Sequence, residues 1–170
     1  MWNKFTQHAQ RAVYFAQVAA EKKETNFVDA EHLLLGLLQE QENSACQLLQ
    51  RLSVSPTHLH DELFALLPLG LGQTHAEMSL TKRAKTSIDL AYQEAQALKN
   101  NNIDCEYLFL GVIREGNGLA EQVLSKFNVG LEQARQEVVL QQQAKPSLKA
   151  HDLLFRMFSR PAMKEPPSGS

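Results

Sequence analysis

Apolar residues recur every three to four positions along most of the chain, and this spacing predicts amphipathic helices. Small and apolar side chains share one face across 6–23, with Thr6 in the N-cap position. Three further helices are predicted after it in the sequence: one that begins after Asp29, a short one across 45–52, and one that begins at Pro56. No segment alternates with a period of two, so strands are not expected.

The same order of helices occurs twice. Shifting the sequence by 75 positions aligns it with itself without a gap, and about 16 of the 60 pairs between 6–65 and 81–140 are identical. Many other pairs conserve apolar character. A fixed register over this length indicates a tandem duplication, so we expect an all-α fold of eight helices, four in each copy.

The duplication also predicts the domain boundaries. One domain is expected over 1–143, with repeat one at 5–67 and repeat two at 80–142. The remaining 144–170 form a C-terminal extension, in which 147–158 has the pattern of a short amphipathic helix before a disordered tail. Three roles stay open for this helix: docking back on the repeats, presentation to a partner groove, or contact with an anionic membrane surface.

Composition narrows the class of protein. The 170 residues carry 17 Lys and Arg against 19 Asp and Glu, and a formal net charge of −2 argues against nucleic-acid binding driven by a strong positive field. No apolar run reaches the roughly 18 residues that a membrane span needs. The first residues lack the apolar core of a signal peptide. We therefore expect a cytoplasmic protein without a membrane span.

Catalytic and metal chemistry have little support in the sequence. No Ser/His/Asp or Cys/His arrangement stands out, and the two cysteines, Cys46 and Cys105, are too few for a disulfide scaffold. The cluster from His58 to Glu62 lacks the i, i+4 histidine pair of a zinc helix. We expect no enzyme activity, no catalytic residues, no metal and no cofactor.

A family resemblance follows from particular segments. They are Phe5 and Thr6, EHLLLGLLQE at 31–40, TKRAK at 81–85, and EYLFLGVIREGNG at 106–118. With these segments, about residues 2–142 resemble the Clp N-terminal repeat domain of the ClpA, ClpB and ClpC unfoldases. The phosphate loop G-x-x-x-x-G-K-[ST] of the unfoldase ATPase modules is absent. The chain thus resembles a stand-alone Clp N-domain without the motor.

The resemblance implies both a fold and a function. The family fold is two tandem four-helix repeats related by pseudo-twofold symmetry, here followed by the short C-terminal helix and tail. The implied function is a non-catalytic protein-binding module of Clp-type quality control, which recruits or modulates its partners. These partners would be Clp ATPase or protease subunits, adaptor proteins or substrate proteins. The alternative is a regulator that senses phosphoarginine-type groups and has no Clp partner.

The resemblance also implies candidate ligand-binding residues. In ClpC-like domains the glutamate of the repeated motif accepts the guanidinium of phosphorylated arginine, and nearby threonine and cationic side chains would hold the phosphate. Carried onto this sequence, the candidate residues are Thr6, Glu31, Thr81, Arg83, Lys85 and Glu106. The second copy is the better candidate because His8 stands where the first copy would need an arginine. Another interpretation is that each glutamate only stabilises the positive end of its own helix.

Overall fold

The computed structural model describes residues 1–72, 77–144 and 157. Eight α-helices lie in this part of the chain, as the sequence predicts, and a short 3-10 helix, η1, precedes them. The elements are η1 (Trp2–Lys4), α1 (Gln7–Lys22), β1 (Phe27–Val28), α2 (Ala30–Gln39), α3 (Ser44–Arg51), α4 (Pro56–Leu66), β2 (Ser79–Leu80), α5 (Lys82–Ala97), α6 (Cys105–Glu115), α7 (Gly118–Lys126) and α8 (Leu131–Ala144). The proposed amphipathic helix at 147–158 lies outside the described residues, apart from Met157.

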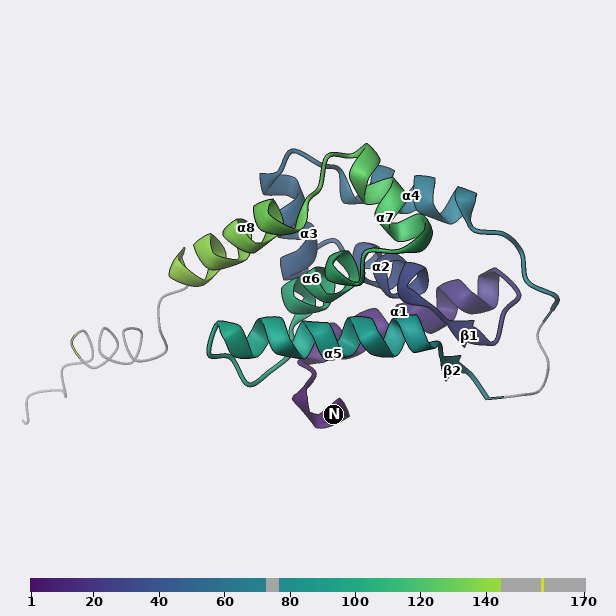
Figure 1. Cartoon of the computed structure of the whole chain (residues 1–170), viewed down its shortest axis with the longest axis horizontal. Coiled ribbons are helices and arrows are strands. Elements are labelled where there is room, and N and C mark those ends of the chain that lie inside the picture. Colours follow the sequence, from purple (N-terminus) through teal and green to yellow (C-terminus); the bar gives the residue numbers. More distant parts are fainter. Residues whose placement is uncertain (73–76, 145–156, 158–170) are drawn as a thin grey trace, which may run out of the picture.

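The two most apolar helices form the centre of the fold. Figure 1 shows α2 and α6 in the middle, with α1 and α5 along one side and α3, α4, α7 and α8 on the other. Every residue of α2 from Ala30 to Leu38 is buried, charged Glu31 included. Because a helix that is apolar all round must be covered on all sides, this pattern places α2 at the centre.

Glycine allows each central helix to approach its neighbour closely. A Cβ atom on Gly36 of α2 would lie 2.0 Å from the main-chain oxygen of Ala12 in α1. The same contact recurs in the second repeat, where a Cβ on Gly111 would lie 2.1 Å from the oxygen of Ser87 in α5. The two equivalent contacts set the packing distance between the first two helices of each repeat.

Two short parallel strand contacts connect the repeats, and the sequence did not predict them. Val28 in β1 pairs with Leu80 in β2, and Phe5 forms an isolated bridge with Ile103. The 75-residue shift converts one pairing into the other, as pseudo-twofold symmetry requires. The prediction that strands are absent is wrong at these positions, because a strand of two residues is too short to show an alternating pattern.

In the described part of the chain, none of the helices combines the length and apolar character needed to cross a membrane.

Candidate functional site

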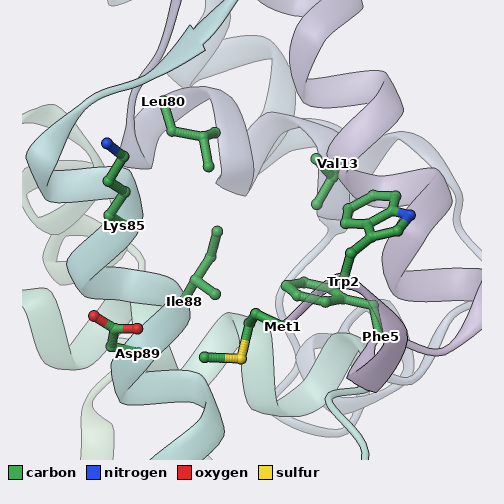
Figure 2. A pocket seen from close by; sticks show the side chains of 8 residues that line it. All are labelled: Met1, Trp2, Phe5, Val13, Leu80, Lys85, Ile88 and Asp89. Carbon is green, nitrogen blue, oxygen red and sulfur yellow. The ribbon is translucent and has the colours of Figure 1, made fainter.

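An apolar hollow lies at the junction of the two repeats. It has a volume of about 300 Å³, and its walls come from η1, α1, β2 and α5. Figure 2 shows Trp2, Phe5 and Val13 on one side, with Lys85, Ile88 and Asp89 on the other. Leu80 and Met1 complete the lining.

Aromatic and sulfur-containing side chains remain exposed at this hollow. Trp2 and Met1 are each 54% exposed, although both are large apolar residues. The indole ring of Trp2 lies 5.3 Å from the Phe5 ring, centroid to centroid. Lys85 and Asp89 are the two ionisable side chains of the lining. A concave apolar surface with a small number of charged groups is suited to burying an apolar side chain of a partner.

A charged cluster forms a second feature between the repeats. Arg83 at the start of α5 binds Glu31 of α2 through two parallel hydrogen bonds, both 3.0 Å. Its guanidinium also contacts Glu115 at 3.1 and 3.2 Å and Asp29 at 3.1 Å. It donates a further hydrogen bond to the main-chain oxygen of Asn117 at 2.5 Å. A single guanidinium is therefore shared by three carboxylates, and Arg83, Asp29 and Glu31 line a cleft of about 400 Å³.

Glu31 also caps a helix of the other repeat. Its Oε1 accepts hydrogen bonds from the main-chain nitrogens of Leu119 and Ala120, at 3.0 and 3.4 Å. These are the first amides of α7, whose own N-cap residue, Asn117, makes no side-chain capping bond. Gly118 has a φ of +77°, and a Cβ there would lie 2.4 Å from Glu31 Oε1. Glycine is thus needed at this position both for its conformation and for space.

Two groups in this region have shifted pKa values, Arg83 and the neighbouring His32. Burial lowers the pKa of the Arg83 guanidinium, but hydrogen bonds to Glu115 and Glu31 and the surrounding negative charge raise it more, so the net shift is upward. Burial also lowers the pKa of His32, and this effect exceeds the opposing influence of Asp29 and Glu31. His32 is therefore neutral at pH 7, and its Nδ1 accepts a hydrogen bond from the Asp29 amide at 2.9 Å.

Two threonine–aspartate pairs join the helix starts of one repeat to those of the other. Thr81 donates to Asp29 at 2.6 Å, and the equivalent Thr6 donates to Asp104 at 2.8 Å. Each threonine hydroxyl also accepts a hydrogen bond from the third residue of its own helix. Both hydroxyls thus act as N-caps and as links between the repeats.

The structure groups the predicted ligand-binding residues across the repeats, not within one copy. Glu31 of repeat one lies with Thr81 and Arg83 of repeat two. Lys85 lies elsewhere, at the edge of the apolar hollow. Glu106 is buried, and its main-chain nitrogen donates to the Ser44 hydroxyl at 3.1 Å.

The two halves of this arrangement differ at one position. Where Arg83 stands in repeat two, repeat one has His8, whose Nδ1 lies 3.7 Å from Glu40. Glu40 is in turn the equivalent of Glu115. We call the group of Glu31, Thr81 and Arg83 the Glu31 half, and the equivalent positions Glu106, Thr6 and His8 the Glu106 half. The Glu31 half therefore contains a guanidinium where the Glu106 half has an imidazole.

Sequence reasoning missed several of these residues. Asp29 was interpreted only as a cap, and Glu115 and Gly118 were not selected at all. For Glu115 the repeat register gave an indirect signal, since it shows that a glutamate occupies this position in both copies, as Glu40 and Glu115. Met1 and Trp2 had no signal, because they precede the repeated segment. Among the described residues, no group of three or more His, Cys, Asp or Glu is placed to hold a metal ion.

A family model described as the Clp repeat (R) N-terminal domain matches this sequence. One match covers residues 4–127, and a second, overlapping match covers 79–153.

Curated relatives give the same result over most of the chain. The chaperone protein ClpB of Oceanobacillus iheyensis is 35% identical over 139 residues, which is 82% of this chain and 17% of the relative. The negative regulator of genetic competence ClpC/MecB of Bacillus subtilis is 37% identical over 140 residues, again 82% of this chain and 17% of the relative. The chain therefore spans about a sixth of the length of these relatives.

Solved structures share the fold at low sequence identity. The N-terminal domain of ClpD from Arabidopsis thaliana superposes with a TM-score of 0.68 at 18% identity, covering 85% of this chain and 97% of that one. The N-terminal domain of the ClpV1 ATPase from E. coli gives a TM-score of 0.64 at 18% identity, covering 81% and 85%.

Proposed function

The chain belongs to the Clp repeat N-terminal domain family, and from that premise we propose that its apolar hollow binds segments of partner proteins in Clp-type quality control. In the Clp ATPases this domain is a non-catalytic module that binds substrates and adaptors. For this chain, the proposed partners are substrate proteins, adaptors, or Clp ATPase and protease subunits. The proposed mode of action is recruitment of these partners or competition for them.

The observation that carries this proposal is the exposure of large apolar side chains around a concave surface. Trp2 and Met1 keep about half of their surface in water while lining a hollow of about 300 Å³. Exposed apolar surface that surrounds a hollow commonly marks a protein-binding site. The hollow has enough room for one or two apolar side chains of an extended segment.

The chain provides its own reporter for this test. Trp2 is its single tryptophan, so intrinsic fluorescence reports directly on the hollow. We would titrate the protein with a permanently unfolded, reduced and alkylated protein that lacks tryptophan. The proposal predicts a saturable blue shift of Trp2 emission, because a bound apolar side chain removes water from the indole.

A matched pair of variants would show whether the hollow is the site. Trp2→Ser removes a 54% exposed side chain from the hollow, while Leu140→Ser removes a 51% exposed one from α8. With a fluorescently labelled unfolded protein, Trp2→Ser should weaken binding about tenfold, since one buried apolar contact is worth roughly 1.5 kcal/mol. Leu140→Ser should bind like the wild type. Equal binding by all three proteins would exclude the hollow.

The identity of the partner needs a separate experiment. The wild-type chain and the Glu31→Ala/Glu106→Ala variant would each be used as bait in the native cytosol. Recovery of a Clp ATPase or protease subunit with the wild type would support the quality-control function. Loss of bound substrates with the variant, while that subunit and the wild-type melting temperature are retained, would identify the two glutamates as receptor positions. Failure to recover any Clp component would contradict the recruitment proposal.

A second candidate function is the recognition of phosphoarginine-type groups by Thr6, Glu31, Thr81, Arg83, Lys85 and Glu106. It is favoured by the geometry at Glu31, where a carboxylate accepts a guanidinium through two parallel bonds. That guanidinium belongs to Arg83, so a ligand at Glu31 must first displace it. In the other half, His8 stands in the equivalent position and the Ser44 hydroxyl donates to Glu106, so a ligand there would displace a neutral donor. For this candidate function we propose the Glu106 half as the binding half.

Thermal shift with free phosphoarginine tests this second candidate. Binding would raise the melting temperature of the wild type, arginine alone and inorganic phosphate alone would not, and Glu106→Gln would remove the effect. Lys126→Gln, at a side chain 68% exposed on α7, is a control that should respond like the wild type. An unchanged melting temperature at millimolar phosphoarginine would reject this candidate.

A further inference from the structure

Repeat one contains another cavity, separate from the hollow and from the Arg83 cluster. It lies between α1 and α4, with α2 beneath, and has a volume of about 260 Å³. This is slightly below the range of roughly 300–1,000 Å³ that is typical of small-molecule sites, so it suits a group the size of one side chain. Leu35 of α2 and Ala19 of α1 give it an apolar base.

Aromatic rings form one wall of this cavity. His60 and Phe64 of α4 stack in parallel, with centroids 6.0 Å apart and an interplanar angle of 5°. The ammonium of Lys23 lies over the Phe64 ring, 4.1 Å from its centroid, and so ties the end of α1 to α4. Phe15 of α1 also lines the space. Aromatic side chains in the lining of a cavity favour an aromatic occupant, through offset stacking or edge-to-face contact.

In the second repeat, charged side chains of the chain itself occupy the positions equivalent to this cavity. The 75-residue shift places Glu94 at the position of Ala19, Arg135 at His60 and Arg114 at Gln39. Arg135 binds Glu94 through two hydrogen bonds of 2.6 and 3.0 Å, and Arg114 binds the same carboxylate at 3.2 Å. In repeat two, therefore, ion pairs connect the helices across these positions. Repeat one has small, neutral or aromatic residues there, which leave the space between the helices open.

The polar groups at the cavity favour an anion. Lys22, Gln39 and His60 supply the polar side chains of the lining, and none of the described residues that line it is an aspartate or a glutamate. Asp61 pairs with His60 at 3.2 Å, but its side chain is 71% exposed and does not line the cavity. A cation and an amide donor beside an apolar, aromatic interior complement a carboxylate attached to an apolar group.

We propose that this cavity in repeat one binds an aromatic group that carries a carboxylate. The chemistry is that of a C-terminal phenylalanine of a protein, or of a free aromatic acid. The aromatic ring would lie between Phe15 and the His60–Phe64 wall, and the carboxylate would face Lys22. This site is independent of the proposed function of the hollow, so either proposal can fail without the other.

Nuclear magnetic resonance of the full chain, labelled with 15N, tests the proposal with N-acetylphenylalanine as the probe. Amide shifts should be saturable and centred on α1 and α4. N-acetylphenylalanine amide, which lacks the carboxylate, should bind at least about threefold more weakly, a loss in the range of an exposed ion pair. No saturable shift up to tens of millimolar, or shifts centred on other helices, would overturn the proposal.

Two variants locate the site. Ala19→Met fills the cavity and should abolish the shifts, while Ala97→Met, at an exposed position of α5, should leave them unchanged. Lys22→Gln changes an exposed side chain, and should remove the preference for the acid over the amide. If Ala19→Met binds like the wild type, or Lys22→Gln retains the preference, the assignment is wrong.

The two sources of the ligand are distinguished by peptides. A hexapeptide that ends in phenylalanine should bind more tightly than N-acetylphenylalanine if the natural ligand is a protein C-terminus. Equal affinity would indicate a free aromatic acid. Tighter binding of a hexapeptide with an amidated C-terminus would contradict the carboxylate and overturn the proposal.

Discussion

Replacing Arg83 with alanine removes the guanidinium that Asp29, Glu31 and Glu115 share. The side chains of Glu31 and Glu115 are only 5% and 6% exposed, so water cannot easily replace the lost partner. Two buried carboxylates would remain beside each other, and α2 would lose a direct link to α5. We expect Arg83→Ala to destabilise the fold substantially, because an uncompensated buried charge is costly.

The size of the effect follows from burial. Removing one partner of a buried ion pair costs about 3–5 kcal/mol. The Arg83 side chain is 31% exposed, so solvent screens part of its interaction, and we reduce the expected loss to about 2–3 kcal/mol. For a domain of this size, that corresponds to a fall in melting temperature of roughly 5–10 °C.

Urea denaturation of four proteins would isolate the Arg83–Glu31 interaction. The wild type, Arg83→Ala, Glu31→Gln and the double variant form a cycle, in which we expect a coupling free energy of about 1–2 kcal/mol. Arg11→Ala is the control, because Arg11 is a 60% exposed arginine with a 2.8 Å ion pair to Glu40. It should cost at most about 1 kcal/mol. Additivity of Arg83→Ala and Glu31→Gln within about 0.5 kcal/mol would refute the argument that the pair acts as a unit.

Three further predictions concern other parts of the fold. Because burial lowers the pKa of His32 below 6.5, the unfolded chain binds a proton that the folded chain does not, so stability should fall from pH 7 to pH 5. Urea titrations of His32→Gln, which keeps a capping acceptor, should show a weaker dependence on pH, and an identical slope would contradict this cause. Gly36→Ala would place a Cβ 2.0 Å from a main-chain oxygen of α1, so calorimetry should show a loss of about 1–3 kcal/mol. Gly130→Ala, with open space around it but directly before α8, should cost less, at most about 1 kcal/mol. Burial raises the pKa of the Cys46 thiol to about 12 and that of Cys105 as well, so a thiol reagent should modify both cysteines only after unfolding, and rapid modification of the native protein would disprove their burial.

Much of the fold could be predicted because the information is local. Helix positions follow from the spacing of apolar residues, and helix starts follow from the side chains of Thr6, Thr81 and Asp29. The repeat then transfers each assignment from one copy to the other. The two-residue strands could not be predicted, because their hydrogen bonds join segments far apart in sequence.

The site was less predictable because its contacts cross between the repeats. Sequence reasoning selected Glu31 and Arg83, but assigned them to different copies of one motif and did not pair them. Their contact depends on how the repeats are placed in space, and the sequence pattern does not encode this directly. Trp2 is a clearer case still, because a residue outside the repeat has no equivalent position and its exposure cannot be inferred from periodicity.

The threonine–aspartate pairs and strand pairs that cross between the repeats make each repeat dependent on the other. Each repeat leaves polar groups at its helix starts that only the other repeat satisfies, as Thr6 with Asp104 and Thr81 with Asp29 demonstrate. In a molecule with one repeat, a twofold dimer would restore these contacts, and its folding would then depend on protein concentration. Covalent linkage replaces that association with an internal one. The duplicated chain can therefore form these contacts without a second molecule.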